Sequence, residues 1–253
     1  MLRNEQSVLG ACIDVLSWDE AIGQIVAWGA ERASRYVCIC NVHSVVTTTR
    51  DSEFMSVINE ADMSTPDGEP IAWALRKMGF PSQERINGPD LMWRYLAEAE
   101  RLSQSVFFYG STEITLAKLR ENLACHFPKL KIVGMYSPRF CQIDAEQDKA
   151  EIDMINQSGA NVTFVGLGCP KQEKWMAAHK GRINATMIGV GAAFDYHAGV
   201  LKRAPLWWQR NGLEWLYRVA TEPRRLFMRY LVTNTLFVIG FSRQLIRARI
   251  SGK

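Results

Sequence analysis

Short apolar segments alternate with longer helix-like segments through the first 190 residues, and this alternation constrains the fold more than any other feature. Five segments have the length and apolar composition of buried strands: 36–40, 105–109, 131–136, 161–165 and 187–190. Strands that are apolar throughout are buried on both faces, and strands that alternate with helices form parallel sheets. We therefore predict an α/β fold, with a mostly parallel, Rossmann-like sheet and helices on both of its faces.

Local signals place the helices between these strands. Ser17 and Glu20 form a capping-box pattern at the start of a helix that we expect to reach residue 33. Pro89 favours the first turn of another helix, and residues 65–68 have the composition of a turn. Further helices are expected from about 42 to 61, from about 113 to 126, over 145–157 and over 170–179.

The C-terminal part of the chain differs in composition from the rest. Residues 202–253 contain eleven Lys or Arg and two acids, a net charge of +9, which leaves −5 for residues 1–201. From about Trp207 onward the sequence is helical, rich in Trp and Arg, and has no further strand. We place a boundary near residue 200, between the body (1–200) and a helical, basic C-terminal appendage (201–253). The charge predicts an anionic partner, although a solvated helix face has the same pattern.

The sequence gives no support for a signal peptide, a membrane-spanning helix or a metal site. Residues 1–6 are followed by no apolar segment of the signal-peptide kind. The longest apolar stretch, 230–241, contains Thr and Asn and is shorter than the roughly 18 residues of a membrane-spanning helix. The six cysteines, Cys141 among them, form no C-x-x-C pair, and the histidines lack metal-ligand spacing, so we predict no metal site. Cys38 and Cys40 are expected to share one strand face as core thiols.

Candidate functional residues lie at the carboxyl ends of the predicted strands, where open α/β sheets bind ligands. Four such ends carry glycine or polar residues: 41–44, 109–112, 166–173 and 189–195. The third is suited to a diphosphate, because its glycines admit a ligand to the backbone and the helix begun by Pro170 directs free N–H groups there. A tight turn without a ligand fits equally well. Neither G-x-G-x-x-G nor the P-loop pattern occurs.

Two charged side chains on predicted loops are candidates for chemistry. Asp67, in Thr-Pro-Asp-Gly, is a carboxylate on a rigid loop and a candidate general base, although a structural Asp-Gly turn is the commoner reason for this sequence. Arg85 has the planar fork that clamps phosphates, or it is a surface residue beside a helix start. His43 and His197 have no fixed partner and are expected to be structural or accessory hydrogen-bonding residues.

These segments and several in the appendage form an ordered series of motifs. The series begins with Asn41, Pro66-Asp67-Gly68 and Glu84-Arg85-Ile86-Asn87-Gly88. It continues with Gly168-Cys169-Pro170-Lys171-Gln172-Glu173, Gly189-Val190-Gly191, Ala198-Gly199, Lys202-Arg203-Ala204-Pro205, Gly212-Leu213-Glu214-Trp215-Leu216-Tyr217-Arg218 and Glu222-Pro223-x-Arg225. Over about residues 8–230 the series resembles the WecG/TagA/CpsF family of glycosyltransferases. Segments 170–173 and 212–218 are the most specific.

The resemblance implies an inverting, metal-independent transferase of bacterial surface-polysaccharide synthesis that uses no cofactor. The implied donor is a UDP-activated hexose such as glucose, N-acetylmannosamine or its uronic acid. The implied acceptor is a sugar linked through diphosphate to a polyprenol, which the appendage would meet at an anionic membrane surface. The protein would then be cytoplasmic and peripheral on the inner face of the plasma membrane. A homo-oligomer is compatible with the sequence, and no nucleic acid partner is expected.

The resemblance also assigns residues. The family's conserved aspartate, its proposed base, falls on Asp67. Donor contacts fall on Asn41, Arg85 and Gln172, and we add their neighbours at the strand ends: Gly68, Gly110, Gly168, Lys171, Glu173 and Gly191. Acceptor and membrane contacts are expected on Lys202, Arg203, Arg218, Arg224, Arg225 and Arg229. Apolar surface for the membrane is expected from Leu226, Leu231, Phe237 and Phe241.

One position departs from the family pattern. Teichoic-acid-type members have Thr two positions before the asparagine, near the donor sugar, where this chain has Ile39. Ile39 cannot donate a hydrogen bond, which favours recognition of different hydroxyls and an exopolysaccharide or related pathway. A non-catalytic nucleotide-binding, membrane-associated scaffold stays open, and an oxidoreductase more remotely. Turnover of a UDP-sugar and a nicotinamide titration separate these classes.

Overall fold

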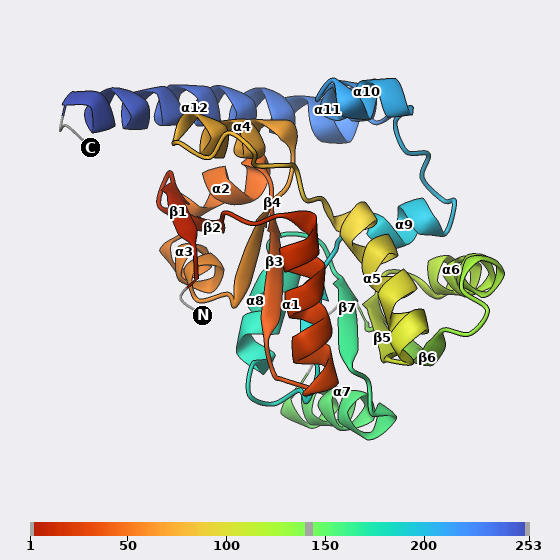
Figure 1. Cartoon of the computed structure of the whole chain (residues 1–253). Helices are drawn as coiled ribbons and strands as arrows, with labels where there is room; N and C mark the ends of the chain where they lie inside the picture. Colours follow the sequence, from red (N-terminus) through yellow and green to blue (C-terminus); the bar gives the residue numbers. More distant parts are fainter. Residues whose placement is uncertain (1–2, 140–143, 251–253) are drawn as a thin grey trace.

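A six-stranded parallel sheet forms the centre of the computed structural model, which describes residues 3–139 and 144–250 (Figure 1). The strands lie in the order β4 (Met63–Pro66), β3 (Tyr36–Cys40), β8 (Thr186–Gly189), β7 (Val162–Gly166), β5 (Ser105–Gly110) and β6 (Lys131–Tyr136). Every neighbouring pair is parallel. All five predicted strands are present, and the predicted α/β class is confirmed.

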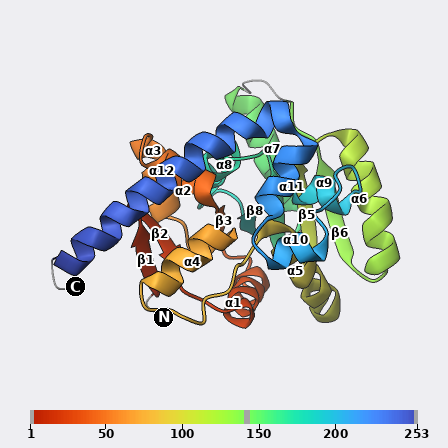
Figure 2. The ribbon, with the colours of Figure 1, turned by 90° about the horizontal axis from the view of Figure 1, so that it is seen from above.

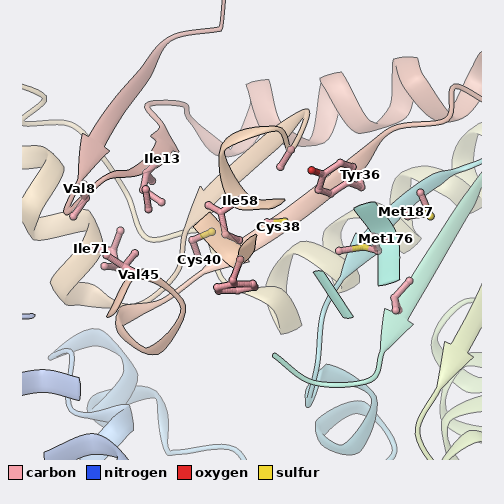
Figure 3. Packing of buried hydrophobic residues seen from close by; sticks show 14 of the residues in the cluster. Val8, Ile13, Tyr36, Cys38, Cys40, Val45, Ile58, Ile71, Met176 and Met187 are labelled. Carbon is pink, nitrogen blue, oxygen red and sulfur yellow. The ribbon is translucent and has the colours of Figure 1, made fainter. Parts of the chain in front are cut away.

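Helices cover both faces of the sheet and create two buried cores. One core contains residues of α1 (Trp18–Ala30), α5 (Gly88–Leu102), α6 (Glu113–His126) and α9 (Ala193–His197). The other contains residues of α2 (Val42–Thr48), α3 (Ser52–Asn59), α4 (Glu69–Lys77), α7 (Ala145–Ser158) and α8 (Lys171–His179). Since side chains alternate along a strand, Ile39 enters the first core. Cys38 and Cys40 share the opposite face of β3 and enter the second core, as predicted (Figure 3).

The N-terminal half contains elements that the sequence did not predict. The single helix expected up to residue 61 is divided into α2 and α3, because the Asp51 side chain caps a new helix by accepting from the N–H of Phe54 at 2.9 Å. The expected turn at 65–68 is wrong for its first two residues, since Thr65 pairs with Ile39 and Pro66 ends β4. The chain also begins with an antiparallel hairpin of β1 (Glu5–Val8) and β2 (Ala11–Asp14).

The appendage forms α10 (Leu206–Arg210), α11 (Glu214–Thr221) and α12 (Pro223–Ile250), and α12 runs across α2 and α4 (Figure 2). Leu226, Phe237 and Phe241 of α12 are buried, and the Phe241 ring packs edge-on against Trp73 of α4 at 5.7 Å. Phe237 and Phe241 belong to the core of the body and Leu226 is buried, so the expectation that these three residues supply apolar surface to a membrane is wrong. Within residues 3–139 and 144–250, no helix has the length and apolarity needed to cross a membrane.

Candidate active site

A cavity of about 340 Å³ opens at the carboxyl ends of β3, β4 and β8, between the body and the appendage. It is lined by eight of the predicted catalytic and donor-binding residues: Asn41, Asp67, Gly68, Arg85, Gly168, Gln172, Glu173 and Gly191. Ile39 also lines it. Gly110 and Lys171 are not among its lining residues. A Cβ at Gly110 would lie 2.6 Å from the carbonyl carbon of Gly166, so this glycine permits close approach of two strand ends.

Asp67 lies at the end of edge strand β4, beside the end of β3. Its backbone N–H donates to the carbonyl oxygen of Cys40 at 2.9 Å, which extends the parallel pairing by one residue. Burial raises the pKa of the Asp67 carboxyl above its usual value, and nearby Glu214 adds to the rise. Arg85, hydrogen bonding from Asn41 and the charge of Arg218 act in the opposite direction. The cavity thus contains a carboxylate that is a stronger base than an exposed one.

Arg85 lies beside Asp67 because the loop that carries it is bound to β4. The N–H of Ile86 donates to the carbonyl oxygen of Pro66 at 2.9 Å, and the Thr65 hydroxyl donates to the carbonyl oxygen of Ile86 at 3.1 Å. The Arg85 guanidinium donates through Nη2 to Glu214 Oε2 of α11 at 2.7 Å, and both side chains are less than 20% exposed. This ion pair joins the body to the appendage across the cavity.

Two glycine turns form the wall next to β7 and β8. Gly168 and Gly191 have φ angles of +79° and +53°, which glycine adopts without strain. Gln172, in the first turn of α8, joins them, because its Oε1 accepts from both of their N–H groups at 3.1 Å. The two turns are therefore held at a fixed separation beside the cavity.

The appendage contributes cationic side chains to the cavity. Arg218 lies 5.9 Å from the ring centroid of Tyr196, and Arg229 lies close enough to His43 to affect its pKa. Burial lowers the pKa of His43, and the positive charge of Arg229 lowers it further. Arg218 Nε and His43 Nδ1 are buried without a hydrogen-bond partner in the described chain. Buried polar atoms of this kind are normally paired, so both nitrogens are available to a ligand or to water in the cavity.

The other predicted acceptor residues are divided between the cavity surroundings and the outer surface. Arg203 donates to Asp90 at 2.8 Å through Nη2, which places it at the start of α5 rather than among the lining residues. Lys202 and Arg224 are exposed, and neither lines the cavity. Arg225 is within α12, but its side chain lies outside the described part.

Several lining residues were absent from the sequence-based set: Tyr196, Glu214, Trp215, Tyr230 and Asn234. Glu214 and Trp215 lie in segment 212–218 of the motif series, so that motif could have identified them, although only its Arg218 was predicted as a site residue. Tyr196, Tyr230 and Asn234 occur in no motif that distinguishes them. In the described ranges, no group of three or more His, Cys, Asp or Glu side chains is arranged to hold a metal ion.

Comparison with known proteins agrees with the motif series. The sequence profile described as the glycosyl transferase WecG/TagA/CpsF family matches residues 6–251. An N-acetylglucosaminyldiphosphoundecaprenol N-acetyl-beta-D-mannosaminyltransferase of Bacillus spizizenii is 34% identical over 178 residues, which cover 70% of this chain and 67% of the relative. The profile spans both the body and the appendage, and the predicted family is confirmed. The chain belongs to the WecG/TagA/CpsF family of glycosyltransferases.

Proposed function

We propose that this chain transfers a hexose from a UDP-sugar to a sugar linked through diphosphate to a polyprenol, with inversion at the anomeric carbon. The observation that carries the proposal is one cavity that combines a partly buried carboxylate, Asp67, with three arginines and two glycine turns. Such a combination suits a neutral hydroxyl nucleophile and an anionic leaving group. In this proposal, residues 1–200 bind the donor and carry out catalysis, and residues 201–253 contact the acceptor and the membrane.

The proposed reaction is a single displacement. Asp67 accepts the proton of an acceptor hydroxyl, and the hydroxyl oxygen forms a bond to the anomeric carbon of the donor. The bond between that carbon and the β-phosphate oxygen breaks, and UDP leaves with the electron pair. Arg85 and the positive N-terminal end of the α8 dipole balance the charge that develops on the diphosphate. The raised pKa of Asp67 supports its role, because a general base is most effective when its pKa approaches the working pH.

The sugars are proposed by class. The Bacillus relative is named for transfer of N-acetylmannosamine to N-acetylglucosaminyl diphosphoundecaprenol, which supports a polyprenyl-diphosphate-linked sugar as acceptor here. The donor is proposed to be glucose, N-acetylmannosamine or its uronic acid. Ile39 is only 7% exposed and lines the cavity with an apolar side chain, which supports a donor pocket that differs from that of teichoic-acid-type members. We therefore favour a role in exopolysaccharide or other surface-polysaccharide synthesis.

Binding and stereochemistry test this proposal separately. Calorimetric titration with UDP is expected to show a single site on the wild-type protein. Nuclear magnetic resonance of the product is expected to show an anomeric configuration opposite to that of the donor. Retention of configuration would contradict the single displacement, and failure to bind UDP would contradict the donor class.

We expect activity to persist in excess EDTA. Arg85 and backbone N–H groups then supply the positive charge that a divalent ion supplies in metal-dependent transferases. The measurement is the rate of UDP release with and without EDTA, followed by addition of Mn²⁺. Complete loss of activity in EDTA that Mn²⁺ restores is the outcome that contradicts metal independence.

The outer face of α12 supports a peripheral position at an anionic membrane. Five apolar side chains at helical spacing on this face are at least 45% exposed: Met228, Leu231, Val238, Ile239 and Ile246. Phe227, Arg243 and Arg247 are exposed on the same helix. An apolar helix face accompanied by arginines binds in the plane of an anionic surface. Of the four apolar residues predicted to face the membrane, Leu231 is the one that is exposed.

A double variant, Leu231→Asp with Val238→Asp, is expected to weaken binding to anionic liposomes by at least about tenfold, because it removes two apolar side chains and adds negative charge. UDP affinity should not change. The matched control is Ile114→Asp, which adds charge at a 70% exposed isoleucine of α6 in the body. Cosedimentation at low and high salt measures both variants. Equal liposome binding by the double variant and the wild type would rule out this face as the contact.

A further inference from the structure

Glu173 is a buried carboxyl group in the cavity wall that has no step in the proposed mechanism. Its side chain belongs to α8 and the residue is 1% exposed. Its Oε1 accepts from Gln172 Nε2 at 2.9 Å. The Cys169 thiol, a weak donor, is the other side-chain group that interacts with this carboxyl. A buried carboxyl group with so few partners is costly, so its place beside a ligand cavity needs a physical reason.

The Gln172 amide has one orientation that satisfies all of its contacts, and Glu173 accepts from its nitrogen end. Two backbone donors, the N–H groups of Gly168 and Gly191, converge on one end of this amide, and only its oxygen can accept from them. The amide nitrogen therefore points the other way, toward the Glu173 oxygen that receives its hydrogen. Gly189 provides the room, since a Cβ there would lie 3.1 Å from Gln172 Nε2. Glu173 thus holds the side chain that joins the two glycine turns.

The surroundings of Glu173 favour its uncharged form. Burial raises the pKa of Glu173 to about 7, while Gln172, the backbone N–H of Glu173 itself and the Cys169 thiol oppose the rise. Cys38 and Cys40 of β3 face it as thiols whose pKa values burial raises well above the usual range.

Charged side chains on the elements around Glu173 interact with residues other than Glu173. Lys174 of α8 pairs with Glu53 of α3 at 2.6 Å and with Asp51 at 3.1 Å. Across the cavity, Arg229 of α12 acts on His43 of α2 and on Cys169.

We propose that Glu173 is a positioning residue for the donor diphosphate. In its uncharged form, Glu173 orients Gln172 and, through Gln172, the turns at Gly168 and Gly191. This inference rests on the proposed function, because it assumes that the diphosphate of a UDP-sugar lies against these turns. Ionisation of Glu173 places a negative charge behind the same turns, and like charges repel in a poorly solvated site. Binding of UDP therefore weakens as Glu173 loses its proton.

Two variants separate charge from orientation. E173Q keeps an oxygen that accepts from Gln172 but cannot ionise, whereas E173L removes the acceptor. The matched control is K174Q on the next residue, whose side chain is one-third exposed and paired with α3. UDP affinity is measured by calorimetry at pH 6 and pH 8.5, and KM and kcat at the same pH values. The ionisation of UDP itself is common to all four proteins and cancels in the comparison.

E173Q is expected to bind UDP as tightly as wild type at pH 6 and about tenfold more tightly at pH 8.5. A tenfold change in affinity corresponds to a shift of one unit in the pKa of Glu173 when UDP binds. E173L should bind UDP about tenfold more weakly than wild type at pH 6, with a raised KM and a smaller change in kcat. K174Q should match wild type. Identical pH dependence in E173Q and wild type overturns the inference while leaving the proposed function in place, as does E173L with wild-type affinity at both pH values. No UDP binding by the wild type overturns both.

Discussion

Replacing Asp67 with Asn is expected to lower turnover by about 10²–10⁴-fold, the usual contribution of a general base. The substitution keeps the shape of the side chain and leaves the backbone bond from residue 67 to Cys40 intact. Folding and UDP affinity should therefore change little, and the loss should appear in kcat. The measurement is the rate of acceptor-dependent UDP release, with UDP titration as the binding readout.

The pH profile of the wild type provides a second readout for Asp67. Its pKa is raised in the folded protein, and the base must be ionised, so kcat/KM should fall as the pH drops through that raised value.

Glu69→Gln is the matched control for Asp67→Asn, because Glu69 also lines the cavity and its partner is Arg76 of its own helix. Near-normal turnover in Asp67→Asn, or an equal loss in Glu69→Gln, would remove Asp67 as the base.

Replacing Arg85 with Ala is expected to lower kcat by about 10²–10³-fold, the cost of losing one preorganised donor to a developing negative charge. The guanidinium lies in the cavity beside Asp67 and is only 15% exposed on its side chain, so its charge is weakly screened. Arg85→Lys should recover only part of the loss, since an ammonium group lacks the planar fork.

Glu214 complicates the interpretation of Arg85→Ala, because the variant leaves this carboxylate without its 2.7 Å partner. The double variant Arg85→Ala with Glu214→Gln removes the stranded charge. We expect it to be as inactive as Arg85→Ala alone, while Glu214→Gln by itself keeps most of its activity. Recovery of turnover in the double variant would show that the stranded Glu214, rather than loss of the arginine, caused the defect.

The parallel sheet was predictable because its strands carry a direct signal. Val37, Phe107 and Phe164 lie in runs that are apolar on both faces, and those runs are strands in the structure. Strand β4 has no such signal, since it is four residues long and contains Ser64, Thr65 and Pro66. It becomes a strand through its pairing with β3, at the edge of the sheet where proline is tolerated.

The cavity was predictable in part for the same reason. The strand-end rule brought Asn41, Gly168 and Gly191 to one place without knowledge of the topology. The pairing of Arg85 with Glu214 joins residues 129 positions apart and has no local signature.

The orientation of α12 was equally hidden, because the helix carries apolar residues on two faces. Phe237 and Phe241 face the body, whereas Met228 and Val238 face outward. Periodicity alone does not distinguish these two faces.

Acceptor-dependent release of UDP tests the central claim most directly. Purified protein is incubated with a series of UDP-sugars and a polyprenyl-diphosphate-linked sugar, and free UDP and the extended lipid product are measured together. We predict release from at least one UDP-hexose only when the lipid acceptor is present, in a one-to-one ratio with product, and a loss of about 10²-fold or more in Asp67→Asn. Absence of release with every UDP-sugar, or release at the same rate without acceptor and without product, would contradict the assignment of this cavity to sugar transfer.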